Sequence, residues 1–374
     1  MNVVRIEATV VAVPLLRPFE TAHGVREVQR SLVIAVYDSD GAVGVGNIDP
    51  SPGYSRESVA DHFAMVRDHF GPAMLGEPAD NVHRMLYRLD AINPAFLDAK
   101  AALEMACLDL TARRAGLSMA TLLGGAVREE VRFNAWIGML APDVAAREAA
   151  DCARAGFRSC KVKVGGDVAT DCARVIAVRE ATGASFSIRA DGNEGYCEVD
   201  AIAFIERSTA AKLQLYEQPI PGDDLVAMAR VRARANAVGV PLMADEALID
   251  HASLIAIIRA DAADIVKVKV MKQGGMLGTR RMIATAEAAG LPCVIGHGYG
   301  LGISTHAEMI VAATSINVME GIECVGPLKM RDDVINAKPD LSSGVLPLPT
   351  ALGLGVTLDP DRLRNYAIDT ATIR

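Results

Sequence analysis

Seven strand-like segments of the chain each end in an ionisable residue, and these residues recur at intervals of 24 to 28 positions. Between them lie longer segments with the apolar spacing of helices. Two of the helical segments, at 143–156 and 278–290, end in Ala-Gly, which is a common helix C-terminal signal. The ionisable residues at the strand ends are Lys163, Asp191, Glu217, Asp245, Lys269, His297 and Glu323.

This repeat predicts an α/β fold of the (β/α)8 (TIM-type) barrel class, with an open doubly wound sheet as the alternative. Eight evenly spaced βα units favour a closed barrel over the open sheet. In a barrel the carboxyl ends of the strands form the rim where active sites lie, so the seven ionisable residues would meet there. The expected strands are 131–138, 159–164, 185–191, 212–217, 240–245, 263–269, 291–297 and 316–323.

The bulk composition describes an ordinary globular protein, with 51% hydrophobic and 22% charged residues. A net charge of −8 and the lack of a long basic run argue against a nucleic-acid or membrane partner. Arg5 and Glu7 argue against a signal peptide, and no apolar stretch is long enough for a membrane span. Seven scattered cysteines without a CxxC pair are typical of a cytoplasmic protein with free thiols.

Three of the rim residues are carboxylates on neighbouring strands, namely Asp191, Glu217 and Asp245. Converging carboxylates repel one another, and a divalent cation removes that repulsion. An all-oxygen ligand set selects a hard ion, so Mg²⁺ is expected, with Mn²⁺ as an alternative. Separate salt bridges to rim lysines are the competing interpretation. Glu246 is the neighbour of Asp245, and strand alternation favours Asp245 as the inward residue.

Two near-identical stretches, CKVKVG at 160–165 and VKVKVM at 266–271, carry paired lysines on the expected second and sixth strands. These strands lie opposite each other in an eight-stranded barrel, so Lys163 and Lys269 would flank one central pocket. A metal ion and a second lysine two positions away would lower the pKa of each toward that of a useful base. Lys161 is then free to bind a substrate carboxylate, while Lys267 has no assigned role.

At this point the chain resembles the enolase superfamily, most closely its muconate-lactonizing-enzyme subgroup (muconate cycloisomerase and mandelate racemase-like). The resemblance rests on the lysine pair of 160–165 together with RADGN, YEQP, MADEAL and VKVMKQGG, and with GPL after the last strand. It covers nearly the whole chain, because strands at 3–14, 31–38 and 42–49 and helices near 55–70, 79–92 and 97–115 look like the family's N-terminal α+β capping domain. The expected domains are therefore a capping domain at 1–128, a catalytic barrel at 129–329, and a segment at 330–374 that packs back on the capping domain.

The resemblance implies a Mg²⁺-dependent isomerase that removes the α-proton of a small carboxylate. It assigns Asp191, Glu217 and Asp245 to the metal, and Lys163 and Lys269 to acid/base catalysis with Lys161 beside them. The overall reaction is left open between racemisation or epimerisation, cycloisomerisation and dehydration. Such enzymes often form homo-oligomers, and a homo-oligomer is expected here.

Four further residues are candidates for substrate binding: His297, Glu323, and His23 and Tyr54 in two loops of the capping domain. The family's dipeptide epimerases carry Asp-x-Asp on the eighth strand, where this chain has Glu323-Cys324-Val325, which puts a dipeptide substrate in doubt. His297 is expected to contact substrate or pack at the rim, because the strand-six aspartate that a histidine base would need is missing. GHGYGLGIS, at 296–304, could bring the backbone close to a ligand or make tight turns that close the barrel.

Two other functions compete with the isomerase. A barrel lysine such as Lys269 could form a Schiff base, as in an aldolase. The chain could also be a barrel that binds acids without turning them over. The three carboxylates argue against the first, and the complete set of ligands and bases argues against the second.

Overall fold

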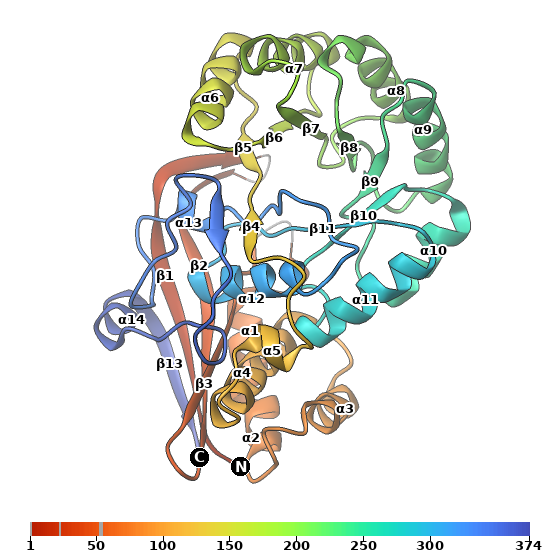
Figure 1. Cartoon of the computed structure of the whole chain (residues 1–374). Coiled ribbons are helices and arrows are strands. Elements are labelled where there is room, and N and C mark those ends of the chain that lie inside the picture. Colours follow the sequence, from red (N-terminus) through yellow and green to blue (C-terminus); the bar gives the residue numbers. More distant parts are fainter. Residues whose placement is uncertain (1, 22–23, 52–54) are drawn as a thin grey trace.

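A computed structural model describes residues 2–21, 24–51 and 55–374 of the chain. A parallel sheet surrounded by helices forms the larger part, and an antiparallel sheet with its own helices lies beside it (Figure 1). The two ends of the chain lie close together at the far end of the smaller part (Figure 1).

The parallel sheet has seven strands, and strands that follow each other in the sequence are hydrogen-bonded neighbours. Both faces of these strands are covered, which is why they consist almost entirely of apolar residues apart from the charged side chains of the site. The strands are β5 (Ala135–Ile137), β6 (Ser159–Lys163), β7 (Ser187–Asp191), β8 (Leu215–Glu217), β9 (Leu242–Ala244), β10 (Ile265–Val268) and β11 (Cys293–Ile295).

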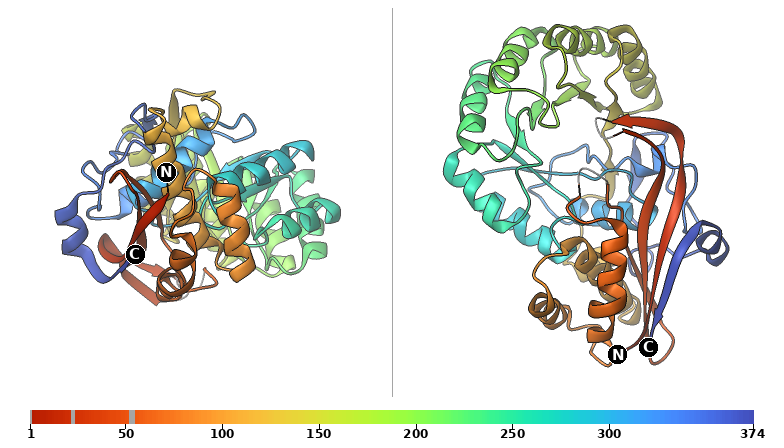
Figure 2. Two further views of the ribbon diagram at one scale, coloured as in Figure 1. Left: turned by 90° about the horizontal axis from the view of Figure 1, so that it is seen from below. Right: turned by 180° about the vertical axis from the view of Figure 1, so that it is seen from behind.

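The sheet is curled, and a helix follows each strand on its outer side (Figures 1 and 2). The two helices end at or directly before the predicted Ala-Gly: α6 ends at Ala155 with Gly156 in a left-handed conformation, and α11 ends at Ala288, just before Ala289-Gly290. The helices are α6 (Pro142–Ala155), α7 (Val168–Thr182), α8 (Glu198–Arg207), α9 (Leu225–Ala237), α10 (His251–Ala260), α11 (Met276–Ala288) and α12 (Gly302–Ala313).

The segment expected as an eighth strand, 316–323, is not a continuous strand. It makes isolated parallel bridges with both edges of the sheet: Val318 with Cys293, Glu323 with Gly296, and Ile322 with Phe133. Gly321 interrupts the extended backbone with a φ of 79°, which explains why the ladder is broken. These bridges place Glu323 between the first and last strands of the sheet.

The antiparallel sheet has the order β13-β1-β2-β3 and forms the core of the capping domain. The first two strands are longer than expected and form a hairpin that extends to the larger part (Figure 1). Its strands are β1 (Val3–Thr21), β2 (Gly24–Asp38), β3 (Val43–Ile48) and β13 (Ala367–Ile373). Its helices are α1 (Val59–Met65), the π-helix η1 (Val66–Phe70), α2 (Gly71–Met74), α3 (Val82–Ile92), α4 (Leu97–Arg114) and α5 (Met119–Leu122).

Shorter elements complete the described part of the chain. The strand β4 (Glu130–Arg132) pairs with β12 (Val345–Pro347) in a separate two-stranded sheet. The others are the 3₁₀ helix η2 (Thr209–Ala211), α13 (Gly326–Lys329) and α14 (Pro360–Tyr366). None of the helices in the described ranges is both long and apolar enough to cross a membrane.

Helix α4 connects the two parts, and Glu104 is the residue that makes the connection specific. Its carboxylate accepts hydrogen bonds from the N–H groups of Met276 (3.0 Å) and Leu277 (2.8 Å) at the start of α11. Gly275 leaves room for it, because a Cβ there would lie 2.4 Å from the Glu104 carboxyl carbon. Glu104 therefore caps a helix of the larger part from within the capping domain, and its burial raises its pKa to about 7.

This buried carboxyl predicts a pH-dependent contribution to stability. The folded pKa of Glu104 lies above its unfolded value, so its contribution is fully present at low pH and is lost as the pH rises through about 7. Glu104→Gln removes the titration and keeps one acceptor oxygen. We expect the free energy of unfolding of the wild type, measured relative to that of E104Q, to fall by about 2 to 3 kcal/mol between pH 5 and pH 8.

Urea unfolding at both pH values measures this difference. Glu180→Gln, at an exposed glutamate on α7, is the control and should leave the pH profile unchanged. Identical pH profiles for wild type and E104Q would contradict the prediction.

Candidate active site

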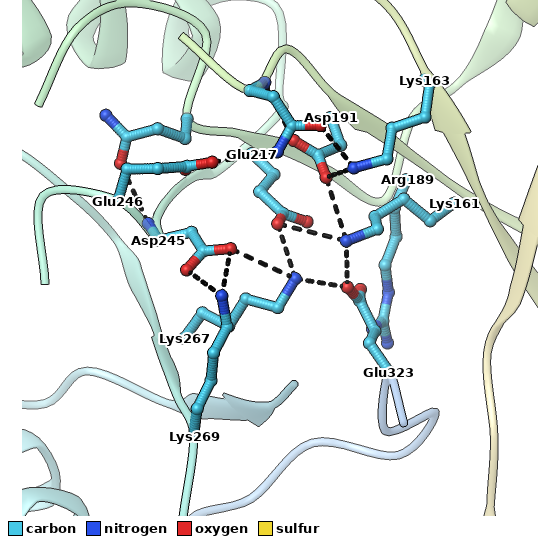
Figure 3. Close-up of polar contacts among 12 residues, drawn as sticks. Lys161, Lys163, Arg189, Asp191, Glu217, Asp245, Glu246, Lys267, Lys269 and Glu323 are labelled. Atoms are coloured by element: carbon cyan, nitrogen blue, oxygen red, sulfur yellow. Dashed lines mark hydrogen bonds and ion pairs between the residues drawn. The ribbon is translucent and has the colours of Figure 1, made fainter. Parts of the chain in front are cut away.

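Four lysines from two strands converge on one group of carboxylates (Figure 3). Lys161 and Lys163 alternate on β6, while Lys267 lies on β10 and Lys269 directly follows it. Three strands, β7, β8 and β9, separate the two pairs in the curled sheet. The side chains consequently approach the carboxylates from two sides, as the opposed lysine stretches predicted.

The pair on β6 holds the carboxylates of β7 and β8. Lys161 Nζ lies 2.9 Å from Asp191 Oδ2, 3.2 Å from Glu217 Oε1 and 2.6 Å from Glu323 Oε2. Lys163 Nζ lies 2.6 Å from the same oxygen of Asp191 and also contacts Asn193. Lys163 is the more accessible of the two, with 19% of its side chain exposed against 2% for Lys161.

The two lysines of the second pair, Lys267 and Lys269, differ from each other in the direction of their pKa shifts. Lys269 Nζ lies 2.6 Å and 2.9 Å from the two carboxylate oxygens of Asp245. Burial outweighs this attraction and, with Lys272 and Lys267 nearby, lowers the pKa of Lys269 to about 8. Burial also acts on Lys161 and Lys267, but there the facing carboxylates outweigh it and hold the pKa above the usual value. The main cause of the lowered pKa of Lys269 is thus burial, whereas the sequence analysis expected a metal ion and the neighbouring Lys267 to lower it.

The three predicted metal ligands lie at the ends of neighbouring strands and are buried. Asp191 ends β7, Glu217 ends β8, and Asp245 directly follows β9. Their exposed fractions are 0%, 0% and 2%. Burial would raise the pKa of Asp191, but Lys161 and Lys163 outweigh it and hold that pKa below its usual value.

Ammonium groups lie between these carboxylates. Accordingly, within residues 2–21, 24–51 and 55–374, no three His, Cys, Asp or Glu side chains are grouped as ligands of one metal ion. The donor chemistry nevertheless suits a hard cation, since all three groups are carboxylates. Oε2 of Glu217 is buried and has no hydrogen-bond partner among the described residues, and burial together with Asp191 raises the pKa of Glu217 to about 8. A divalent cation beside Glu217 would satisfy this oxygen and favour its ionised form.

Glu246 also lies at this cluster, although strand alternation favoured its neighbour Asp245. Alternation does not apply to either residue, because β9 ends at Ala244. Glu246 Oε1 accepts a hydrogen bond of 2.9 Å from Asn193 Nδ2, while its Oε2 has no hydrogen-bond partner in the described part of the chain. Burial, with the charge of Asp245, raises the pKa of Glu246 to about 7.

Glu323 is surrounded by cations and is completely buried. Besides Lys161 and Lys267, Arg189 contacts it, with Nη1 at 2.9 Å from Glu323 Oε1. The sequence analysis missed Arg189, although its position two residues before Asp191 on β7 places both on the same face of the strand. It also missed Trp136 on β5, whose ring centre lies 4.6 Å from Lys161 Nζ and 5.4 Å from Lys163 Nζ.

His297 joins the capping domain to the larger part. Its Nδ1 contacts Glu308 on α12, and its Nε2 lies 3.3 Å from Asp49 Oδ2 of the capping domain. Burial would lower the pKa of His297, but the two carboxylates outweigh it and raise that pKa to about 10. The predicted contact between His297 and substrate remains a prediction. The other two substrate-binding candidates, His23 and Tyr54, lie outside the described residues.

Comparison with known proteins assigns the chain to a family. A model described as "Enolase C-terminal domain-like" matches residues 144–362, and one described as "Mandelate racemase / muconate lactonizing enzyme, N-terminal domain" matches residues 5–124. L-Ala-D/L-Glu epimerase of Bacillus subtilis (strain 168) is 30% identical over 359 residues, covering 95% of this chain and 97% of the relative.

Two further relatives span the chain. Muconate cycloisomerase 1 of Pseudomonas putida is 33% identical over 371 residues, covering 97% of this chain and 98% of the relative. The crystal structure of N-succinyl Arg/Lys racemase from Bacillus cereus matches with a TM-score of 0.94 at 28% identity, covering 100% of both chains. The chain therefore belongs to the enolase superfamily, in its mandelate racemase and muconate lactonizing enzyme family, as the motifs around its lysines and carboxylates indicated.

Proposed function

We propose that this protein is an isomerase that removes the α-proton of a small carboxylate, as a racemase, an epimerase or a cycloisomerase. One observation carries the proposal: Lys163 and Lys269 reach the same carboxylate cluster from strands on either side of β7, β8 and β9. The three named relatives, an epimerase, a racemase and a cycloisomerase, are all isomerases, which supports this reaction class.

The metal assignment follows from the donor set. Asp191, Glu217 and Asp245 would hold Mg²⁺, or Mn²⁺ in its place. When bound there, the ion supplies positive charge that stabilises a substrate carboxylate while negative charge develops on it. The support from this chain is the buried, unpartnered oxygen of Glu217 between two further carboxylates.

The lysines then divide the proton chemistry. A pKa of about 8 leaves part of Lys269 as the neutral amine near neutral pH, so it can accept a proton from one face of the α-carbon. Lys163 faces the same space from the opposite side and returns a proton there. Lys161, almost completely buried beside Asp191 and Glu217, provides positive charge for the substrate carboxylate.

The cations around Glu323 indicate which class of substrate the site favours. Lys161, Lys267 and Arg189 already neutralise this carboxylate. A free α-amino group of a substrate would therefore compete with three cations of the protein for one acid. This favours a carboxylate without a free ammonium group, such as an N-acyl amino acid or an acid with no nitrogen, over a dipeptide, whose amino end is free.

The same proposal includes a closed barrel. The bridges of 316–323 with both edges of the seven-stranded sheet support a role for this segment as the eighth strand. Closure would hold Glu323 and the lysines of β6 and β10 at fixed positions around one pocket.

Isotope exchange tests the reaction. We expect the wild type, with Mg²⁺ in D₂O, to exchange the α-proton of at least one acid among N-acyl amino acids, proline derivatives, dipeptides, muconates and sugar acids. Lys163→Ala and Lys269→Ala each remove one acid/base group and should slow the full isomerisation by about 100-fold or more. Proton NMR follows both exchange and product.

The control is Lys212→Ala, at an exposed lysine far from β6 and β10 along the chain, which should behave as wild type. Undiminished exchange by the K163A/K269A double variant would refute the proposed roles of the two lysines.

Metal removal tests the ligand assignment. Treatment with EDTA should abolish exchange, and adding Mg²⁺ or Mn²⁺ should restore it and raise the melting temperature. At a free metal concentration of 100 times Kd, stabilisation of about 2.7 kcal/mol is expected. Asp191→Asn should lose both effects, because an amide neither balances the charge of the ion nor binds it as strongly. If exchange persists unchanged in EDTA, the ligand assignment is wrong, and metal-free chemistry such as a Schiff base at Lys269 is favoured.

A further inference from the structure

Lys267 is a fourth lysine in the cluster that the two-lysine reaction does not require. Its Nζ lies 2.5 Å from Glu217 Oε1, 2.6 Å from Glu323 Oε2 and 3.6 Å from Asp245 Oδ2. It therefore contacts two of the three proposed metal ligands with a single ammonium group. Only 1% of its side chain is exposed, so water does not screen these interactions.

The chain makes room for this lysine at a glycine of the neighbouring strand end. A Cβ on Gly296 would lie 2.1 Å from Lys267 Cε and 3.1 Å from Lys267 Cδ. The backbone holds Gly296 in this position, because its N–H donates to the carbonyl of Val268 at 2.9 Å. The first glycine of the 296–304 stretch is thus required by the path of the Lys267 stem, which marks the lysine as a built part of the site.

We propose that Lys267 acts as an internal cation that competes with the divalent ion for Glu217 and Asp245. This inference rests on the metal ligands of the proposed function. A cation that binds these oxygens must share them with the Lys267 ammonium or displace it, and like charges repel strongly at such distances in a buried site. Lys267 therefore lowers the affinity of the site for the ion. When the ion is absent, Lys267 neutralises the carboxylates and holds them together.

Direct binding measurements test this role without relying on turnover. MnCl₂ and MgCl₂ are titrated into metal-free full-length protein by calorimetry, and the fluorescence of Trp136, the one tryptophan of the sequence, gives a second signal from beside Lys161. Lys267→Met, which removes the charge and keeps most of the stem, should lower the Kd for Mn²⁺ by about tenfold or more. Lys267→Arg, which keeps the charge, should stay closer to the wild-type Kd than K267M does.

The metal-free proteins give the second half of the test. Without its ammonium the cluster carries uncompensated negative charge, so K267M should melt below wild type in EDTA and recover most of the difference in MnCl₂. Lys212→Met is the matched control at an exposed lysine and should change neither Kd nor melting temperature. If K267M is insoluble, Lys267→Gln, which retains a hydrogen-bond donor for the carboxylates, provides the same comparison.

Three results would overturn the proposal. An unchanged or higher Kd for Mn²⁺ in both neutral variants shows that Lys267 does not compete with the ion. Equal melting temperatures of K267M and wild type in EDTA show that it does not hold the cluster together. Absence of binding to both wild type and K267M removes the metal site itself, whereas α-proton exchange by the wild type still tests the lysine chemistry independently.

The glycine gives an independent prediction. Gly296→Ala should lower the melting temperature, because the new methyl group collides with the Lys267 stem. Gly298→Ala is the matched control, since a Cβ there would meet no atom nearer than Ser51 Oγ at 3.5 Å. In a Lys267→Ala background the effect of G296A should largely disappear, and additive effects in this double-mutant cycle would contradict the packing argument.

Discussion

Mutual neutralisation of buried charge is the constraint on which the site depends. Lys161, Lys267 and Lys269 have almost no contact with solvent, and neither do the carboxylates that they face. A buried charge without a partner is far more costly than a buried pair, so neither set could occupy the centre of the sheet alone. The short strands β6 and β10 can carry lysines on their inner face only because β7, β8 and the segment after β9 supply acids within ion-pair distance.

The capping domain contributes to this arrangement through buried polar contacts and not through apolar packing alone. Glu104 fixes the start of α11, the helix that follows the lysines of β10. Asp49 fixes the turn before α12, accepting hydrogen bonds from Ser304 Oγ at 2.8 Å and from the N–H of Leu301 at 3.3 Å. Both acids lie on the capping domain and bind backbone or side-chain donors of the larger part. The relative position of the two parts is therefore specified at the points where the chain leaves the site.

Much of this site could be predicted from the sequence because the repeat is regular. Period-two alternation and even spacing located Lys163, Asp191 and Glu217 at neighbouring strand ends without any three-dimensional information. The same alternation could have identified Arg189 as an inward residue.

Other features depend on partners that no local pattern indicates. Glu104 meets α11 at a separation of 172 positions, and Asp49 meets Leu301 at a separation of 252. The segment 316–323 is not the continuous strand that was expected, because a single glycine, Gly321, turns the backbone there. Asp245 faces the lysines, but Glu246 also lies at the cluster, because β9 ends before either residue and strand alternation no longer applies to them.

The pairing of β1 with β13 has a consequence for how the chain acquires its structure. Ile6 lies opposite Ile373, a separation of 367 positions (373 − 6), so the capping sheet draws on both ends of the described sequence. During synthesis β1 remains an open sheet edge until the strands of the larger part have all emerged, and open edges invite wrong pairing. Contacts this distant in sequence also slow folding. The capping sheet can therefore be completed only after the larger part has been synthesised, although β1 precedes that part in the sequence.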